Sequence, residues 1–195
     1  MKFKTLAAAF LLSTTCAHAS VLTLENVGVP GDVSQPGFST EGYQFNDNSY
    51  VVDVSPGSPF SEATNGGHSG MYAALNNTDI GSSMEMFRIG GGLMSVENLW
   101  IHGWLGAAGE VVIEGYRNGI AVQTVNFTFG DTWEAIALDF GSIDMLSFSS
   151  HDLFLVDDIN VTPKDSEPGT VTEPATPLLF AAALATLALV RKRRA

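Results

Sequence analysis

Short runs of strand-forming residues are the feature that most constrains the fold of this chain. Each run is rich in β-branched and aromatic residues, and glycine, proline, asparagine, aspartate or serine separates it from the next run. No long window keeps the period of an amphipathic helix. The pattern therefore predicts β-strands at 21–27, 50–54, 71–75, 83–89, 96–104, 110–116, 120–129, 133–140, 144–150 and 153–161.

The pair Asn118-Gly119 gives the clearest turn signal in the sequence. Alternating segments flank it on both sides, and this dipeptide favours the type I′ turn of a tight β-hairpin. A hairpin among many short strands is typical of a sandwich. We predict an all-β fold, a two-sheet β-sandwich of jelly-roll type, for residues 20–162.

The first residues of the chain are typical of a secretory signal peptide. A basic start, MKFK, precedes a short apolar run, and Ala17 and Ala19 give the small-residue pattern of a cleavage site. We predict that 1–19 is a signal peptide cleaved after Ala19. The alternative is a lipoprotein signal in which Cys16 is lipidated. Cys16 is the only cysteine, so its removal with the signal would leave no thiol for a disulfide or a nucleophile.

The charge of the central region restricts the class of partner. Between residues 20 and 163, Arg88 and Arg117 are the only cations and eighteen residues are acidic, which gives a formal net charge of −16. Such a surface repels phosphate backbones, so nucleic acid is not an expected partner. The balance suits a secreted protein or one that gathers cations.

The C-terminal region has the composition of a tethered tail. Residues 163–173 are polar and proline-rich like a linker, and an apolar stretch follows at 177–190. This stretch is short against a hydrocarbon core of ~30 Å, but it predicts a short transmembrane helix. The positive-inside rule then places the acidic domain outside and the basic end in the cytoplasm. That basic tail, 191–195, contains Arg191, Lys192, Arg193 and Arg194.

Residues 174–195 and the motif just before them resemble the PEP-CTERM sorting signal of Gram-negative bacteria. The motif consists of Thr172, Glu173, Pro174, Ala175 and Thr176. The family usually has Pro-Glu-Pro where this chain has Thr-Glu-Pro. The resemblance implies export through the inner membrane, retention there by the helix, and recognition and processing by an exosortase near the motif. The expected destination is the cell surface or the extracellular space.

The preceding domain resembles a recurring PEP-CTERM ectodomain. The segments that carry the resemblance are LTLENV, STEGYQF, GGHSGMYAAL, WEAIALDF and FLVDDI, in that order. This set is similar to galactose-binding-like jelly rolls, the scaffold of many carbohydrate-binding modules. The resemblance thus implies a sandwich that often binds glycans, without identifying a ligand.

The same resemblance implies a structural Ca²⁺ that pins the first strand to the last. The matching positions are Glu25, Asp157 and Asp158. Alternation sends the two aspartates to opposite faces, so one of them is expected to be a direct side-chain ligand. Calcium accepts mixtures of carboxylate and carbonyl oxygens, and adjacent acids in an acidic domain repel one another. The alternative is that these aspartates form a solvated strand end.

No catalytic motif stands out in the sequence. It contains no nucleophile elbow, HExxH pair or phosphate-binding loop. His68, His102 and His151 lie in separate segments, where a structural role is the simplest interpretation. Carboxylates are so numerous that chance pairs are inevitable, and sequence does not place any two across a cleft. We therefore do not expect an enzyme.

The segment LWIHGWL offers a candidate ligand platform. Strand alternation would place Trp100, His102 and Trp104 on one side, and Leu99, Ile101 and Leu105 on the core side. A sugar ring could stack on the tryptophans, and the next strand could supply hydrogen bonds from Glu110, Glu114 and Tyr116. The alternative is that both tryptophans are core residues of a strand buried on both faces.

Together these features predict an exported, membrane-tethered, non-enzymatic protein of an extracellular polysaccharide matrix or cell surface. A glycan-binding module is one expectation for its domain. A purely structural or adhesive matrix component and a polysaccharide-active hydrolase are the alternatives.

Overall fold

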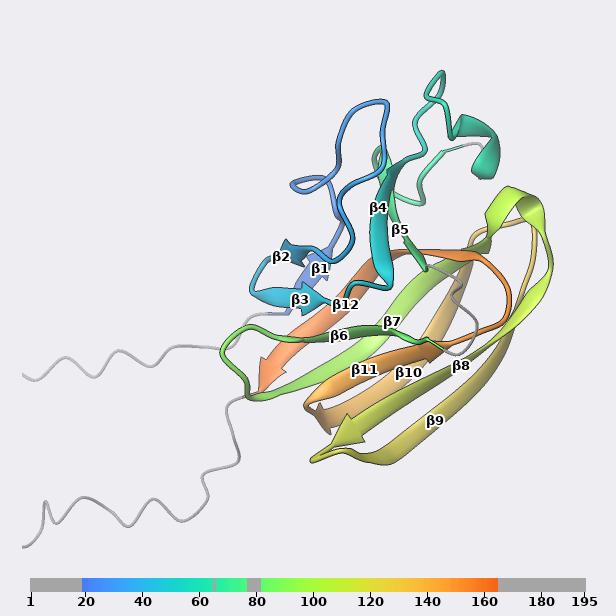
Figure 1. Ribbon diagram of the computed structural model, residues 1–195. Coiled ribbons are helices and arrows are strands. Elements are labelled where there is room, and N and C mark those ends of the chain that lie inside the picture. Colours follow the sequence, from blue (N-terminus) through green and yellow to red (C-terminus); the bar gives the residue numbers. More distant parts are fainter. Residues whose placement is uncertain (1–18, 65, 77–81, 165–195) are drawn as a thin grey trace, which may run out of the picture. The chain divides into compact units, whose positions relative to one another are not determined.

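Two antiparallel six-stranded sheets make up the part of the chain that the structure describes (Figure 1). The structure, a computed structural model, describes residues 19–64, 66–76 and 82–164. The predicted cleavage position Ala17, the sorting motif at 172–176, the transmembrane helix at 177–190 and the basic tail lie outside these residues. Within the described residues, no helix is long and apolar enough to cross a membrane.

Sheet A contains the first and last strands of the domain. Its order is β10-β7-β12-β5-β4, and β1 pairs with the end of β12 beyond β5. The bounds are β1 Ser20–Leu22, β4 Ser49–Asp53, β5 Tyr72–Asn76, β7 Leu93–Gly103, β10 Glu134–Ile143 and β12 Phe154–Lys164. The central strand β12 runs two residues past the predicted boundary at 162, because Pro163 and Lys164 still pair with β7.

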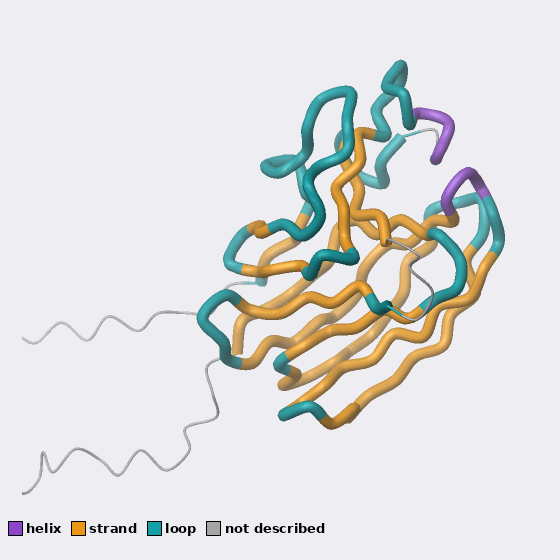
Figure 2. The backbone as a smooth tube through the Cα atoms, in the orientation of Figure 1, coloured by secondary structure: helices purple, strands orange, loops and turns teal. Residues whose placement is uncertain are grey.

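Sheet B has the order β2-β3-β6-β11-β8-β9. Its bounds are β2 Ser39–Thr40, β3 Tyr43–Phe45, β6 Met84–Arg88, β8 Gly109–Arg117, β9 Ile120–Phe129 and β11 Met145–Ser149. Two short 3-10 helices, η1 Ser61–Ala63 and η2 Trp104–Gly106, lie in connections (Figure 2). The predicted all-β class and two-sheet arrangement are confirmed. All ten predicted runs contain a strand, although the first strand is shorter than 21–27, and β2 and β3 were not predicted.

The predicted hairpin at Asn118-Gly119 is confirmed. Both residues have positive φ, 53° and 75°, as a type I′ turn requires. Arg117 and Ile120 face each other directly across the turn. The turn thus sets the register of β8 and β9, which form one long edge of sheet B.

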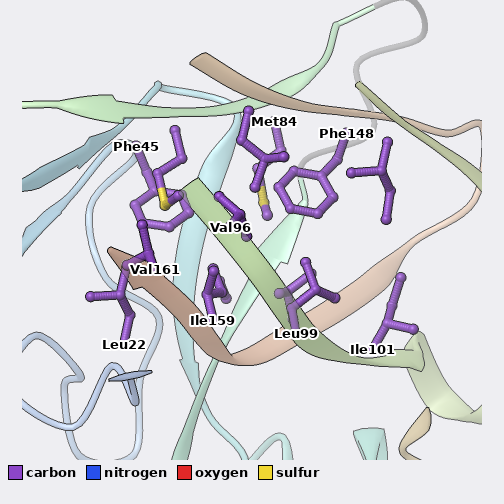
Figure 3. Packing of buried hydrophobic residues seen from close by; sticks show 14 of the residues in the cluster. Leu22, Phe45, Met84, Val96, Leu99, Ile101, Phe148, Ile159 and Val161 are labelled. Atoms are coloured by element: carbon purple, nitrogen blue, oxygen red, sulfur yellow. The ribbon is translucent and has the colours of Figure 1, made fainter. Parts of the chain in front are cut away.

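The main core lies between the two sheets. Figure 3 shows Phe45, Met84 and Phe148 of sheet B beside Val96 and Leu99 of sheet A. All five side chains are at most 1% exposed. They come from alternate positions of their strands, so the residues between them point to the outer faces of the two sheets.

Sheet A is also covered on its outer face. A second apolar cluster lies there and contains Val52, Val54, Ala63, Ala73 and Leu155, with Val33, Phe60, Leu75, Trp104 and Trp133 packed against it. Much of this cover comes from the loops and η1 between β4 and β5 (Figure 2). The part of sheet A around β4, β5 and the start of β12 is therefore buried on two faces, whereas β10 and the outer face of sheet B present exposed or partly exposed side chains.

A matched pair of leucine truncations tests this core assignment. Leu99 is 0% exposed and Leu105 is 63% exposed. Leu99→Ala should lower the free energy of unfolding by about 2–5 kcal/mol, because it leaves a cavity between the sheets. Leu105→Ala should change it by less than about 0.5 kcal/mol. Denaturant unfolding of the full-length protein in mild detergent measures both; equal losses would contradict the assignment.

Candidate ligand-binding site

The tryptophan platform predicted on β7 is not an open surface. Trp100 and His102 do point away from Leu99 and Ile101, as alternation requires, and both aliphatic residues are fully buried. However, the ring of His68 stacks on Trp100 with a centroid separation of 3.6 Å and an interplanar angle of 15°. His102 is only 2% exposed. This face of β7 is thus covered by protein.

Trp104 and Leu105 depart from the predicted alternation. The strand ends at Gly103, where an added Cβ would lie 1.8 Å from the carbonyl oxygen of Ala107. The chain then turns tightly, Leu105 takes a φ of 54° and its side chain is exposed. Trp104 packs into the second cluster, 6.3 Å from the ring of Phe60. The expectation that Leu105 is a core residue is wrong, because the turn ends the strand geometry.

Tyr116 lies on the other sheet from Trp100. The turn at η2 carries the chain from β7 in sheet A to β8 in sheet B. Tyr116, Glu114 and Glu110 alternate with the buried Val111, Ile113 and Gly115, so they project from the outer face of sheet B. The structure therefore does not bring the predicted tryptophans and the predicted hydrogen-bonding residues together.

The outer face of sheet B instead presents a band of side chains in rows along β11. Its floor consists of Met145, Ser147 and Ser149; one side consists of Ser83, Glu85 and Phe87, and the other of Val112, Glu114 and Tyr116. Strand register aligns these residues in rows: Phe87, Met145 and Tyr116 form one row, and Glu85, Ser147 and Glu114 form the next. Ser83 Oγ lies 2.8 Å from Ser149 Oγ and closes the third row. We call this arrangement the β11 trough.

Ser147 forms a polar floor at the centre of the β11 trough. It lies between Leu146 and Phe148, which both point into the core, so its own side chain faces the trough. Ser147 is 3% exposed, and its hydroxyl makes no hydrogen bond to another described residue. Its oxygen is not one of the fully buried side-chain atoms that lack a partner, so it keeps a little contact with solvent.

An aromatic pair borders one end of the β11 trough. Phe87 is 37% exposed, so part of its ring faces solvent. Across the trough, the Tyr116 hydroxyl donates a hydrogen bond to Glu114 Oε2 at 2.8 Å. This hydrogen bond, burial and the negative charges of Glu114 and Glu85 raise the pKa of Tyr116. The phenol therefore stays protonated and holds Glu114 in place.

A pocket of about 530 Å³ continues the trough at its other end. Ser83, Val112 and Ser149 line both the trough and the pocket, and Glu110, His151 and Asp152 add ionisable groups. The Ser150 hydroxyl orders this end by donating to the carbonyl of Glu110 at 2.7 Å. The combined surface offers apolar rings, carboxylates and hydroxyls along one line.

The sequence contained a signal for the residues that were missed. In SMEMFRI, Met84 and Met86 are the core residues, so alternation turns Glu85 and Phe87 outward together. In the same way, serine at 147 alternates with large apolar residues. Alternation shows that these side chains share a face of a strand. It does not show which strands are neighbours.

The predicted calcium residues do come together, around the loop that precedes β5. Glu25 Oε1 accepts hydrogen bonds from the backbone N–H groups of Met71 at 2.8 Å and Tyr72 at 3.1 Å. Asp157 Oδ2 accepts one from Ser69 N–H at 2.9 Å. Asp158 contacts the same loop through His68 Nδ1, 2.6 Å from its Oδ2. Three carboxylates thus hold one loop against sheet A.

Asp157 is the buried member of this group. It is 0% exposed. Burial raises its pKa to about 7; hydrogen bonds from backbone N–H groups oppose the rise, and the charges of Asp158 and Glu25 add to it. Among the described residues, no group of three or more His, Cys, Asp or Glu side chains is arranged to hold a metal ion. Any metal here would need backbone oxygens as well.

Comparison with known proteins supports the fold only. No protein-family model matches the sequence, and no curated protein matches it either. A DUF4465 family protein from Bacteroides caccae has a similar structure, with a TM-score of 0.53 and 12% identity over 75% of this chain and 100% of that chain. The CBM22-1 xylan-binding domain of Paenibacillus barcinonensis Xyn10C aligns with a TM-score of 0.42 and 11% identity over 80% of this chain and 100% of that chain.

The raised pKa of Asp157 predicts how stability depends on pH. The folded protein holds a proton on Asp157 up to a pKa of about 7, whereas the unfolded chain releases it near 3.8. The stabilisation that this proton gives to the folded state is fully present below pH 3.8 and is lost as pH rises through about 7. With chelator present, unfolding free energies should fall by an amount on the order of a few kcal/mol across this window.

Asp157→Asn is the variant that isolates this effect, since it cannot ionise. Its stability should decline less between pH 4 and pH 7 than that of the parent protein, because one proton linkage is missing. Asp139→Asn, at an exposed position of β10, is the control and should keep the parent slope. Parallel curves for parent and Asp157→Asn in chemical denaturation would contradict the linkage.

Proposed function

We propose that this domain binds a polysaccharide chain, without cleaving it, in the β11 trough. The observation that carries the proposal is the row structure of the trough, in which two partly exposed aromatic rings flank Met145 and the floor continues through the small polar residues Ser147 and Ser149. Sugar rings have apolar faces that stack on aromatic side chains and hydroxyls that donate to carboxylates. Phe87 and Tyr116 supply the rings, and Glu85 and Glu114 supply the acceptors.

The length of the surface favours a chain over a single sugar. From Glu110 at the pocket to Tyr116 at the aromatic end, β8 advances six residues, which is ~20 Å at the usual rise of a strand. The pocket adds hydroxyl and carboxylate groups at the far end. A linear oligosaccharide could therefore contact the surface at several rings, each with modest energy.

We also propose the cellular setting that the ends of the sequence predict. The protein would be exported, held in the inner membrane by its C-terminal helix, and processed by an exosortase near Glu173-Pro174. The domain, a sandwich of jelly-roll type, would then act at the cell surface or in an extracellular matrix. The start of β1 at Ser20 supports cleavage after Ala19, because the sandwich begins where the predicted signal ends.

We further propose a structural calcium ion at the loop before β5. Gly67 supports this, because an added Cβ there would lie 2.9 Å from the carbonyl oxygen of Ser69, 3.3 Å from that of Gly70 and 3.5 Å from Asp157 Oδ2. Three oxygens thus surround a space that a side chain would fill. Calcium prefers such mixed carboxylate and carbonyl donors. Asp157, Ser69 and Gly70 would hold the ion, which would tie this loop to β12.

The glycan proposal predicts which aromatic residues matter. In pull-down with insoluble polysaccharides, or on a glycan array, the full-length protein in mild detergent should bind at least one glycan. Phe87→Ala and Tyr116→Ala should each weaken that binding about tenfold, the effect of losing one stacking contact of ~1.4 kcal/mol. Ile120→Ala, an exposed apolar residue at the hairpin of the same sheet, should leave it unchanged.

Two outcomes would count against this proposal. Binding that survives the double variant Phe87→Ala and Tyr116→Ala would place the ligand elsewhere on the domain. Release of reducing ends from the bound polysaccharide would show a hydrolase instead of a binding module.

The calcium proposal predicts a ligand-dependent melting temperature. A site that forms only in the folded state should raise the midpoint of the full-length protein as calcium increases from zero to the millimolar range. Gly67→Ala should abolish that response, because its methyl group occupies the space between the three oxygens. Asp139→Asn should keep the response. A midpoint that is the same in calcium and in chelator would remove the ion from this site.

A further inference from the structure

Among the residues that the structure describes, no cation forms an ion pair with either carboxylate of the β11 trough. Glu85 and Glu114 lie on opposite sides of Ser147 in one row. Among the described residues, the only ion pair is His68 with Asp158, on the other sheet. Arg88 follows Phe87, but its Nη1 donates to the carbonyl oxygens of Leu93 and Lys164, away from the row. The trough therefore carries uncompensated negative charge.

The environment of Tyr116 reports this charge independently. Besides its hydrogen bond to Glu114 and its burial, the influences that raise its pKa are the charges of Glu114 and Glu85. Glu85 thus reaches Tyr116 electrostatically across the floor strand, and no positively charged side chain acts in the opposite direction. The negative charges of both carboxylates therefore act on the hydroxyl of Tyr116.

The row also has a definite shape. Neighbouring strands lie ~4.8 Å apart, so the backbone positions of Glu85 and Glu114 are ~10 Å apart with the small Ser147 between them. Ser147 is only 3% exposed, so neighbouring side chains leave little room above it. Its hydroxyl makes no hydrogen bond to another described residue, and its oxygen is not one of the fully buried atoms that lack a partner. A small polar group fits between the two glutamates better than a bulky one.

We propose that the β11 trough selects polysaccharides with free amino groups, and that an ammonium group of an amino sugar sits above Ser147 between Glu85 and Glu114. An ammonium group has three donors and no acceptor. The row offers three acceptors, namely one carboxylate on each side and the serine oxygen below. Glu114 can take part while Tyr116 occupies its Oε2, because Oε1 remains available.

The same charges exclude other ligand classes. A uronate, sulfate or phosphate group in this row would meet two like charges, which costs more as water leaves the trough. A neutral acetylated sugar could still donate hydrogen bonds from its hydroxyls. It would lack the charge-assisted hydrogen bonds of an ammonium group, which are stronger. The inference rests on the proposed function and adds the substrate class, with free amines preferred over acetylated amines and uronates disfavoured.

The test compares oligosaccharides of equal length by calorimetry with the full-length protein in mild detergent and physiological salt. The probes are a glucosamine oligomer, its fully N-acetylated counterpart and a galacturonate oligomer. The glucosamine oligomer should bind at least about tenfold more tightly than the acetylated one, which corresponds to ~1.4 kcal/mol. The galacturonate oligomer should not bind measurably, with or without calcium.

Variants separate a specific site from the general attraction of an acidic protein for cations. The pair Glu85→Gln and Glu114→Gln should reduce affinity for the glucosamine oligomer about tenfold or more, and should leave the acetylated oligomer nearly unchanged. The pair Glu62→Gln and Glu97→Gln changes the net charge equally at exposed positions on η1 and β7. It should have little effect. Ser147→Ala should weaken the amine preference without abolishing stacking.

The failures of the two proposals can be told apart. If the glucosamine and acetylated oligomers bind equally and Phe87→Ala weakens both, the trough binds glycans but the amine preference is wrong. If both glutamate pairs reduce affinity equally, the attraction is non-specific, and the inference is also wrong. If galacturonate binds only with calcium, the carboxylates bridge a metal ion instead. If no oligomer binds in a manner that depends on Phe87, the proposed function itself fails.

Discussion

Burial of sheet A on both faces determines where this domain can meet a ligand. Its central strands carry apolar side chains toward both sides; Val51 and Val52 of β4 are neighbours in sequence, point in opposite directions, and are both 0% exposed. Such two-sided burial is typical of strands that are covered on each face. The second cluster and the loop before β5 cover sheet A around β4, β5 and the start of β12, so this part of the sheet offers no open strand surface, whereas the outer face of sheet B is left partly exposed.

That cover depends on the last strand of the domain. β12 pairs with β7 on one side and with β5 and β1 on the other, so it joins segments from both ends of the described chain. Its residues Asp157 and Asp158 also hold the loop before β5. Sheet A therefore cannot reach its final order before residues 154–164 are in place. Contacts between segments so far apart in sequence generally make folding slow, because the chain loses the entropy of closing the loop before the stabilising contacts form.

The strands could be predicted from sequence, but their assembly into sheets could not. Alternation and turn residues depend on local chemistry, which explains why all ten predicted runs contain a strand and why the Asn118-Gly119 turn has the expected dihedral angles. The prediction that the strands at 96–104 and 110–116 lie next to each other was wrong. The turn at Trp104–Gly106 carries the chain from one sheet to the other. A tight crossover and a hairpin both use glycine, so composition does not distinguish them.

The candidate site illustrates the same limit. Tyr116 and Glu114 were predicted to supply hydrogen bonds beside the tryptophan platform; the structure places both on the outer face of sheet B, away from that platform. Their partners Glu85 and Ser147 come from strands that are distant in sequence, and only the register of β6, β11 and β8 brings the three into a row. The convergence of Glu25 and Asp157 on one loop was foreseen through a family resemblance, since no local pattern connects positions so far apart.

The two groups of carboxylates show how burial determines what neutralises a charge. Asp157 is sealed from solvent, and a carboxylate in that position must be neutralised within the folded protein, by a proton or by a cation held at fixed oxygens. Glu85 and Glu114 are only partly buried, so water stabilises their charges until a ligand displaces it. The loss of water then has to be offset by donors on the ligand. Because the region from 20 to 163 has only two cations for eighteen acids, a ligand that carries its own positive charge is the natural complement to this trough.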